Sequence, residues 1–445
     1  MKKLTKRWQM LLYGCAGFGV NMLNLIVGSY LCSALLKGGF EEHVESWTYL
    51  NKDLVVAGLW SVLVLVAKVI DGLIDIPMSS LTDNLKTKWG RRRPAILIGF
   101  VPMIIAYLLF LKPLDPGVSV LNTIWFAVIL CIFYTFYTLT MLTYYGTFAE
   151  IVDNESDRVF ISNVKSVCDV IYFILGYALI PVFVSMSINI RTVALMFLPL
   201  SLTMAIPFFL IKEHSTLEEP DVREEGDAKG VSIAKSFSVS FKNKSFLYWL
   251  CVVFVMNIGL QLFLSGINEF FSTTGINMTI VMACSFAPVP LTILLYNKLV
   301  HKRGLKLGFQ YVMLVFSAAM LLMYFCLGMP KASTQLSIMG AIGGLIASFS
   351  IGAFFSITYT VPSQLAAEEN ARTGICASSM YFAVEGLFEG VSAGIASGLI
   401  LTWLKQNHGA AYITIIVAFF CLSAFVMAFF LPGNIASLGK DKTGK

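Results

Sequence analysis

Asp71 and Asp75 lie one helical turn apart within an apolar stretch that spans residues 54–82. Lys68 precedes them by about one turn, and at about 100° per residue all three side chains fall on one helix face. Each charge inside a bilayer costs roughly 2.5 kcal/mol or more. Two carboxylates at this spacing repel each other unless a proton or a cation lies between them. We therefore predict that Asp71 and Asp75 form a Na⁺ or H⁺ site.

Lys68 has two interpretations. Its ammonium can replace the cation when the site is empty, which would also place Lys68 beside a substrate cavity. Alternatively, Lys68 forms a structural ion pair with one aspartate while the other carries a proton. Pro77 removes one backbone hydrogen bond just after Asp75, so the helix is expected to loosen beside the site.

The composition indicates a membrane protein. Of the 445 residues, 57% are hydrophobic and 13% are charged, with a mean hydropathy of +0.77. A soluble domain carries about 25% charged residues. Repeated apolar runs of about 20 residues match the length of a transmembrane helix. The expected fold class is all-α, with spans at residues 9–36, 54–82, 94–112, 120–148, 162–186, 191–211, 246–271, 276–298, 307–328, 336–362, 373–403 and 410–431.

The basic residues predict the orientation. Most Lys and Arg residues fall on the side of the N-terminus, and the opposite side holds only Lys37, Lys52, Lys112, Arg191, Lys331 and Lys405. This imbalance predicts that both termini are cytoplasmic, in a plasma (cytoplasmic) membrane protein. The net charge of +6 is then an orientation signal, so the expected partners are the lipid bilayer, a small-molecule substrate and a coupling cation, with no nucleic acid. We expect a monomer.

Catalysis is not expected. The four histidines, His43, His214, His301 and His408, fall in loops or at span ends, and HExxH does not occur. We therefore see neither the nucleophile–base pair nor the set of metal ligands that an enzyme active site requires. We predict that the protein is not an enzyme, with no cofactor other than the coupling Na⁺ or H⁺ and no metal site of another kind.

The two halves of the chain carry matching loops. A basic loop follows the second span of each half, and acidic residues followed by an arginine come after the fourth: Glu150, Asp153, Glu155, Asp157 and Arg158 in one half, and Glu368, Glu369 and Arg372 in the other. This is the pattern of an internal twofold repeat. We predict two pseudo-symmetric six-helix bundles, at residues 1–211 and 246–445, joined by a polar cytoplasmic linker at 212–245.

These loops also predict a gate. Arginines of one loop can form bidentate pairs with carboxylates of another, and a network of such pairs would close the cytoplasmic side. The alternative is that the arginines only set the orientation, because single exposed pairs contribute little. The residues of the predicted cytoplasmic gate are Arg91, Arg92, Arg93, Glu150, Asp157, Arg158 and Arg372.

Polar residues inside the spans are candidates for binding a solute. A buried amide such as Asn21 requires partners and can face a polar cavity. Tyr137 and Tyr145 lie in an aromatic span and offer flat faces with polar tips, although helix packing explains such tyrosines equally well. Asp169 either pairs with Lys165 at i, i+4 or reaches the cavity.

The second half adds four candidates. Asn257 and Gln261 are one turn apart and share a helix face. Glu385 and Glu389 form a second acidic pair at i, i+4. Three readings stay open for this pair: a proton or cation site, a site for donor groups of the substrate, or a structural pairing with Lys68 or another basic group.

The sequence resembles the glycoside-pentoside-hexuronide:cation symporter family of the major facilitator superfamily. The resemblance rests on Asp71-x-x-x-Asp75 with Pro77 beside it, Trp89-Gly90 with the basic run to Pro94, and Tyr13-Gly14 through Gly17-Phe18-Gly19. It implies a twelve-helix fold with a central cavity and cation coupling. It further implies that Asp71 and Asp75 bind the cation, that Thr138 assists, and that an aromatic residue near Tyr145 stacks on a sugar.

The sugar-binding part of the family pattern is altered. Asn21 stands where the family has a sugar-binding aspartate, Met141 replaces another, and Ser166 falls near the position of an arginine. We therefore expect a cation-coupled symporter of a small polar solute, with a sugar or glycoside as the leading substrate class. The alternatives are an uncoupled uniporter or exchanger, or a carrier of a non-sugar, lipid-like substrate.

Overall fold

We describe a computed structural model of residues 3–83, 85–149, 151–152, 155–217, 243–331, 333–373 and 378–437. Most of the predicted linker, and with it residues 218–242, lies outside the described residues. Among the described helices, eleven are long and apolar enough to cross a membrane. The number of candidate spans rises to twelve if the bent pair of helices Met278–Phe286 and Val289–Arg303 counts as one span. The predicted all-α fold with up to twelve spans is confirmed.

The chain divides into two compact units. The N-terminal unit comprises residues 1–36, 45–176 and 183–230, and the C-terminal unit comprises residues 37–44, 177–182 and 231–445. The α-helices from the first half are α1 (Arg7–Cys15), α2 (Phe18–Leu25), α3 (Val44–Trp47), α4 (Ala57–Asp83), α5 (Arg92–Phe110), α6 (Val120–Gly146), α7 (Glu155–Ile174), α8 (Ile180–Ser185), α9 (Ile190–Phe197) and α10 (Ala205–Leu210). Those of the second half are α13 (Lys244–Thr274), α14 (Met278–Phe286), α15 (Val289–Arg303), α16 (Leu305–Phe325), α17 (Thr334–Thr373), α18 (Ser378–Gly394), α19 (Leu401–Gln406), α20 (Ile413–Ala428) and α21 (Gly433–Ala436).

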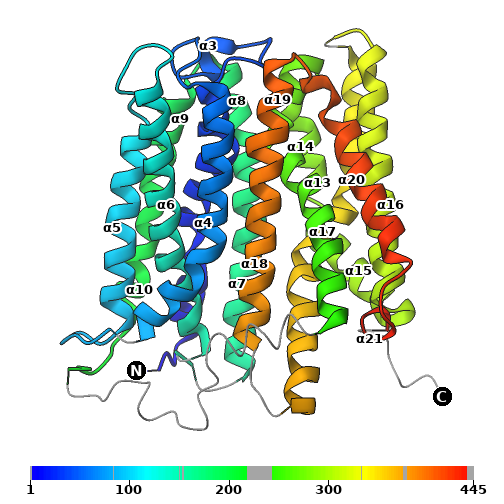
Figure 1. Cartoon of the computed structure of the whole chain (residues 1–445). Coiled ribbons are helices and arrows are strands. Elements are labelled where there is room, and N and C mark those ends of the chain that lie inside the picture. The colour runs from blue at the N-terminus through cyan, green and yellow to red at the C-terminus, as the bar shows by residue number, and fades with distance from the viewer. Residues whose placement is uncertain are drawn as a thin grey trace. The chain divides into compact units, whose positions relative to one another are not determined.

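Helix α6 is central to the packing of the N-terminal unit, because both α4 and α5 pack along it (Figure 1). Its start is capped by Ser119, whose hydroxyl accepts a hydrogen bond from the backbone N–H of Asn122. Asn122 is fully buried and its side chain donates to the carbonyl oxygens of Leu54, Asp115 and Gly117. This capping holds the loop before α6 against the start of α4, and so fixes the register of the two helices that carry the predicted cation site.

Glycines allow the first span to approach its neighbours. A Cβ atom on Gly14 would lie 2.8 Å from the Val164 side chain, and one on Gly19 would lie 1.8 Å from the Leu200 carbonyl oxygen. Small residues at helix crossings are what close packing in a membrane requires. Because the atom facing Gly19 belongs to the backbone, no side-chain rotation can make room there.

Replacing Gly19 with alanine is therefore expected to destabilise the N-terminal unit by about 1–3 kcal/mol, because α2 must move away from the Leu198–Met204 turn. The measurement is the unfolding midpoint of the purified protein in detergent. The matched control is Gly58→Ala near the start of α4, where no atom lies within 4 Å of the new Cβ. There the higher helix propensity of alanine should leave stability equal or raise it by up to about 1 kcal/mol. Equal effects of the two variants would contradict the packing role of Gly19.

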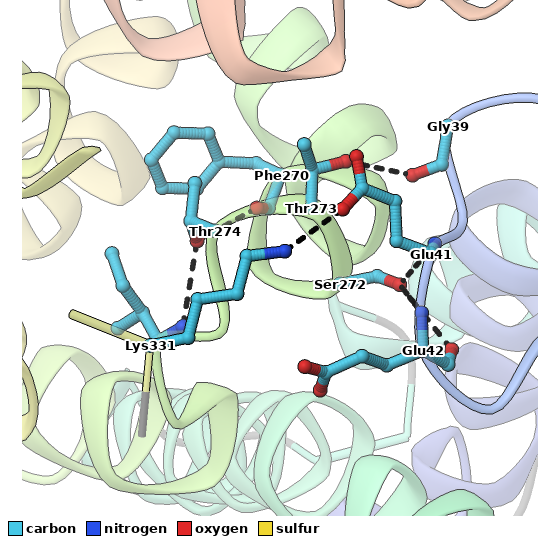
Figure 2. A network of polar contacts seen from close by, with 9 residues as sticks. Gly39, Glu41, Glu42, Phe270, Ser272, Thr273, Thr274 and Lys331 are labelled. Carbon is cyan, nitrogen blue, oxygen red and sulfur yellow. Dashed lines mark hydrogen bonds and ion pairs between the residues drawn. The ribbon is translucent and has the colours of Figure 1, made fainter. Parts of the chain in front are cut away.

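The segment of residues 37–44 packs on the end of α13 within the C-terminal unit. The backbone amides of Glu41 and Glu42 both donate to the Ser272 hydroxyl, and the Thr273 hydroxyl donates to the Gly39 carbonyl oxygen (Figure 2). The Lys331 ammonium lies 2.8 Å from a carboxylate oxygen of Glu41. This hydrogen bond raises the pKa of Lys331, so the exposed pair stays charged near neutral pH.

Beneath this segment lies a fully buried ion pair. The Lys405 ammonium is 2.7 Å from a carboxylate oxygen of Glu269, and the two side chains are 3% and 0% exposed. Lys405 also lies over the Phe40 ring, 4.6 Å from its centroid. Gly39 has a φ of +90°, and a Cβ atom there would lie 2.9 Å from the Glu269 side chain, so only glycine fits this contact.

Candidate substrate and cation site

The predicted cation site is built by α4 and α6. The Lys68 ammonium lies 3.7 Å from a carboxylate oxygen of Asp71 and 3.8 Å from the centroid of the Tyr134 ring. The Thr138 hydroxyl lies close enough to the Asp71 carboxylate to stabilise its charge. The structure thus places Asp71 and Thr138 near each other, with the Lys68 ammonium facing the carboxylate, and cation binding there stays a prediction. The side chain of Asp75 lies outside the described residues.

Tyr134 and Thr138 are one turn apart on α6, which explains how one helix supplies both contacts. The ring of Tyr134 stabilises the Lys68 ammonium through its face, in the manner of a cation–π contact. Tyr134 was not among the predicted site residues. Its spacing of four residues from Thr138 is the signal that places it on the same face.

A second polar group in the same unit has Asn21 at its centre. The Asn21 amide nitrogen lies 3.3 Å from the Asp169 carboxylate and 3.3 Å from the Tyr145 hydroxyl. The Tyr137 hydroxyl donates to the Asn21 amide oxygen at 3.0 Å. Four predicted substrate-binding residues are therefore neighbours. They come from α2, α6 and α7.

Lys165 completes this group, which we call the Asn21 cluster: Asn21, Tyr137, Tyr145, Lys165 and Asp169. The Lys165 ammonium is 2.6 Å from Asp169 and lies over the Tyr145 ring at 5.0 Å. Asp169 is thus both paired with Lys165 and in contact with Asn21, and its place in a substrate cavity stays a prediction. Asn21 is 6% exposed, whereas Lys165 and Asp169 keep 28% and 18% of their surface. The ion pair is therefore partly exposed, whereas Asn21 is buried.

The polar residues of the C-terminal unit form a separate set. The Trp249 indole donates to one oxygen of Glu385 at 3.3 Å, and Glu385 is 3% exposed. The Asn257 amide donates to the Ser392 hydroxyl and to the backbone oxygen of Glu389. These contacts tie α13 to α18. No periodicity identifies Trp249, because its partner is 136 residues away in the chain.

Gln261 follows Asn257 by one turn on α13 and is half-buried. The two amides therefore lie on the same face of α13, as predicted. The hydrogen bonds to α18 described above are made by Asn257.

The predicted gate arginines contact the end of the sixth span. The Arg93 guanidinium donates to the Phe208 carbonyl oxygen and lies 4.8 Å above the Phe208 ring. The Glu213 carboxylate accepts the backbone amide of Arg92 at 2.8 Å and fills the space beside Gly90. Asp157 lies in the first turn of α7. Glu150 and the side chains of Arg158 and Arg372 lie outside the described residues, so the gate stays a prediction.

The known proteins that this chain resembles are transporters. The family described as MFS/sugar transport protein matches residues 12–409. The chain belongs to the MFS/sugar transport protein family. This membership confirms the predicted superfamily and identifies the chain as a transporter rather than an enzyme.

Within this family, individual relatives are distant. A stretch of 105 residues is 32% identical to part of the lactose permease of Lactobacillus helveticus, and it covers 23% of this chain and 16% of that protein. The structure of the nucleoside transporter NupG matches with a TM-score of 0.61 at 16% identity, over 95% of this chain and 97% of that one. A D-xylose-proton symporter matches with a TM-score of 0.62 at 13% identity, over 98% and 100%. These two likenesses show the fold.

Proposed function

We propose that this member of the MFS/sugar transport protein family is a secondary active symporter that moves a small polar solute, a sugar or glycoside, together with Na⁺ or H⁺. The observation that carries the proposal is the Asn21 cluster, which places an amide, two phenols and an ion pair inside apolar helices. Such a set offers donors, acceptors and aromatic faces, as recognition of a polyhydroxylated ring requires. The names of the lactose permease and the D-xylose-proton symporter support a sugar.

Asp71, Asp75 and Thr138 are proposed to bind the coupling cation, and Asn257 and Gln261 to contact the solute from the C-terminal unit. Carboxylate and hydroxyl oxygens are suitable ligands for Na⁺. A carboxylate that is removed from water also binds a proton more readily. Coupling then requires that the cation and the solute raise each other's affinity by the same factor. The arrangement we propose is a monomer in the cytoplasmic membrane with both termini in the cytoplasm.

One observation favours a second candidate, an uncoupled uniporter or exchanger. Lys68 already places a positive charge 3.7 Å from Asp71. If this ammonium stays bound throughout the cycle, Asp71 has no need of an external cation. Uptake that responds to neither a Na⁺ nor a pH gradient would identify this mode.

The test begins with a thermal-shift screen of sugars, glycosides, nucleosides and lipids, each with and without Na⁺. A solute at 100 times its Kd stabilises the folded state by about 2.7 kcal/mol, so a true substrate is expected to raise the unfolding temperature clearly. A hit only among lipids would overturn the sugar assignment and support the lipid-like alternative.

The second step is uptake of the hit by proteoliposomes under an imposed Na⁺ or pH gradient. Asp71→Asn is expected to abolish gradient-driven accumulation, because the cation loses a ligand, while exchange of the solute across the membrane continues. The matched control, Asp115→Asn in the loop before α6, should behave as wild type. Undiminished accumulation by Asp71→Asn would remove Asp71 from the coupling site.

A further inference from the structure

The carboxylates described within the spans fall into two groups. Asp71, Asp169 and Glu269 each have a lysine ammonium within ion-pair distance, at 3.7, 2.6 and 2.7 Å. Among the described residues, no lysine or arginine forms an ion pair with Glu385 or Glu389. Lys68, which the sequence allowed as a partner for this pair, instead contacts Asp71 and Tyr134.

Glu269 and Glu385 can be compared directly, because both are buried in the C-terminal unit and only Glu269 has a described lysine beside it. Glu269 is 0% exposed and has Lys405 beside it. Glu385 is 3% exposed; its Oε1 accepts the Trp249 indole hydrogen, and its Oε2 is buried without a hydrogen-bond partner among the described residues. An ionised carboxylate in such a place carries an uncompensated desolvation cost of several kcal/mol. One indole donor does not offset a full charge.

Among the described residues, the surroundings of Glu385 contain no lysine or arginine in an ion pair with it. Helix α13 contributes Trp249 and, further along, Asn257, whose amide is already used by Ser392 and by the Glu389 backbone. On α18 itself, the Tyr381 hydroxyl accepts the Asn243 amide one turn before Glu385. Among the described residues, the charged group whose field reaches Glu385 is Glu389, one turn further on. The described residues of α17 and of the Ile395–Ile400 turn form no ion pair with either glutamate.

We propose that Glu385 and Glu389 together bind one exchangeable proton, so that the C-terminal unit carries a proton site of its own. The proton removes one of two charges that would otherwise face each other at i, i+4. It also gives the Glu385 carboxyl an O–H group that can donate to Glu389. The binding of this proton is independent of the proposed function, and only its use in driving transport rests on it.

The experiment is infrared spectroscopy of the purified full-length protein in lipid. A neutral carboxyl has a C=O stretching band, clear of the amide bands, that shifts in D₂O. Wild type is expected to show this band at neutral pH and to lose it as the pH rises. Glu385→Gln should remove the part of the band that this pair contributes, seen as a wild-type-minus-variant difference. Glu389→Gln should shift the frequency of that part and the pH at which it disappears, because the two groups interact.

The matched control is Glu269→Gln, which removes an equally buried but lysine-paired glutamate and should leave the band unchanged. If that variant does not fold, Asp169→Asn serves the same purpose with a more exposed pair. No band in the wild type, a band of equal intensity in wild type and Glu385→Gln, or removal by Na⁺ at constant pH of the Glu385-dependent part of the band would each overturn the proposal. A failure of the proposed function would appear differently, as absence of solute uptake with the band still present.

Discussion

Replacing Asn21 with alanine is expected to weaken substrate binding about tenfold or more. The Asn21 amide contacts Asp169, Tyr137 and Tyr145, so its removal frees three groups that it now holds in place. Hydrogen bonds to charged groups contribute about 1.5–3 kcal/mol each, and 1.4 kcal/mol is a factor of ten in affinity. The measurement is the Kd of the screened solute, taken from the ligand dependence of the unfolding temperature.

A matched control separates loss of binding from loss of folding. Asn407→Ala removes an exposed amide whose partner is the Trp403 carbonyl oxygen of its own helix end, and it should leave the Kd unchanged. Asn21→Ser, which keeps a smaller polar group, is expected to fall between wild type and alanine. An Asn21→Ala protein that folds and binds the solute as wild type does would show that the Asn21 cluster is structural.

Replacing Lys405 with methionine is expected to destabilise the C-terminal unit by about 3–5 kcal/mol. Its ammonium is 2.7 Å from Glu269 and both side chains are almost fully buried, so the variant removes the positive charge that faces a buried carboxylate. The Phe40 ring also loses its cation, and the segment of residues 37–44 loses part of its support. The measurement is the unfolding midpoint of the purified protein in detergent.

The double variant Lys405→Met with Glu269→Gln should recover most of this stability, because no unpaired charge then remains. Lys331→Met is the matched control. It breaks an ion pair of similar length, 2.8 Å, but with both partners 53% exposed, and solvent screening limits its cost to about 0–1 kcal/mol. If Lys405→Met costs no more than Lys331→Met, the buried pair does not hold this end of the unit together.

The buried carboxylates of this transporter differ in whether a described lysine lies beside them. Where a lysine lies beside a carboxylate, as at Asp71, Asp169 and Glu269, the protein supplies its own countercharge. Among the described residues no lysine lies beside Glu385, and we propose that a proton taken up from solvent neutralises its charge. In the C-terminal unit, the position of Lys405 therefore separates Glu269, which has a lysine beside it, from Glu385, which we propose takes part in binding a proton.

Several site contacts could be predicted because they depend on spacing within one helix. Lys68 with Asp71, and Lys165 with Asp169, lie about one turn apart, so helix geometry alone makes them neighbours. Thr138 was found through family resemblance, since its partner Asp71 is on another helix. Trp249 was not found, because an indole in an apolar span gives the same signal whether it packs or donates a hydrogen bond.

The sequence by itself determined the spans, the membrane setting and the fold class of this protein, because long apolar runs leave the backbone no other way to satisfy its hydrogen bonds in lipid. It also determined which residues are costly to bury. Only the tertiary structure decided which partner each buried polar residue contacts. The pairing of Asn21 with Asp169, of Trp249 with Glu385 and of Lys405 with Glu269 joins residues more than 100 positions apart. Such pairs depend on which helices pack together and on their rotation, and the local pattern of each helix contains neither.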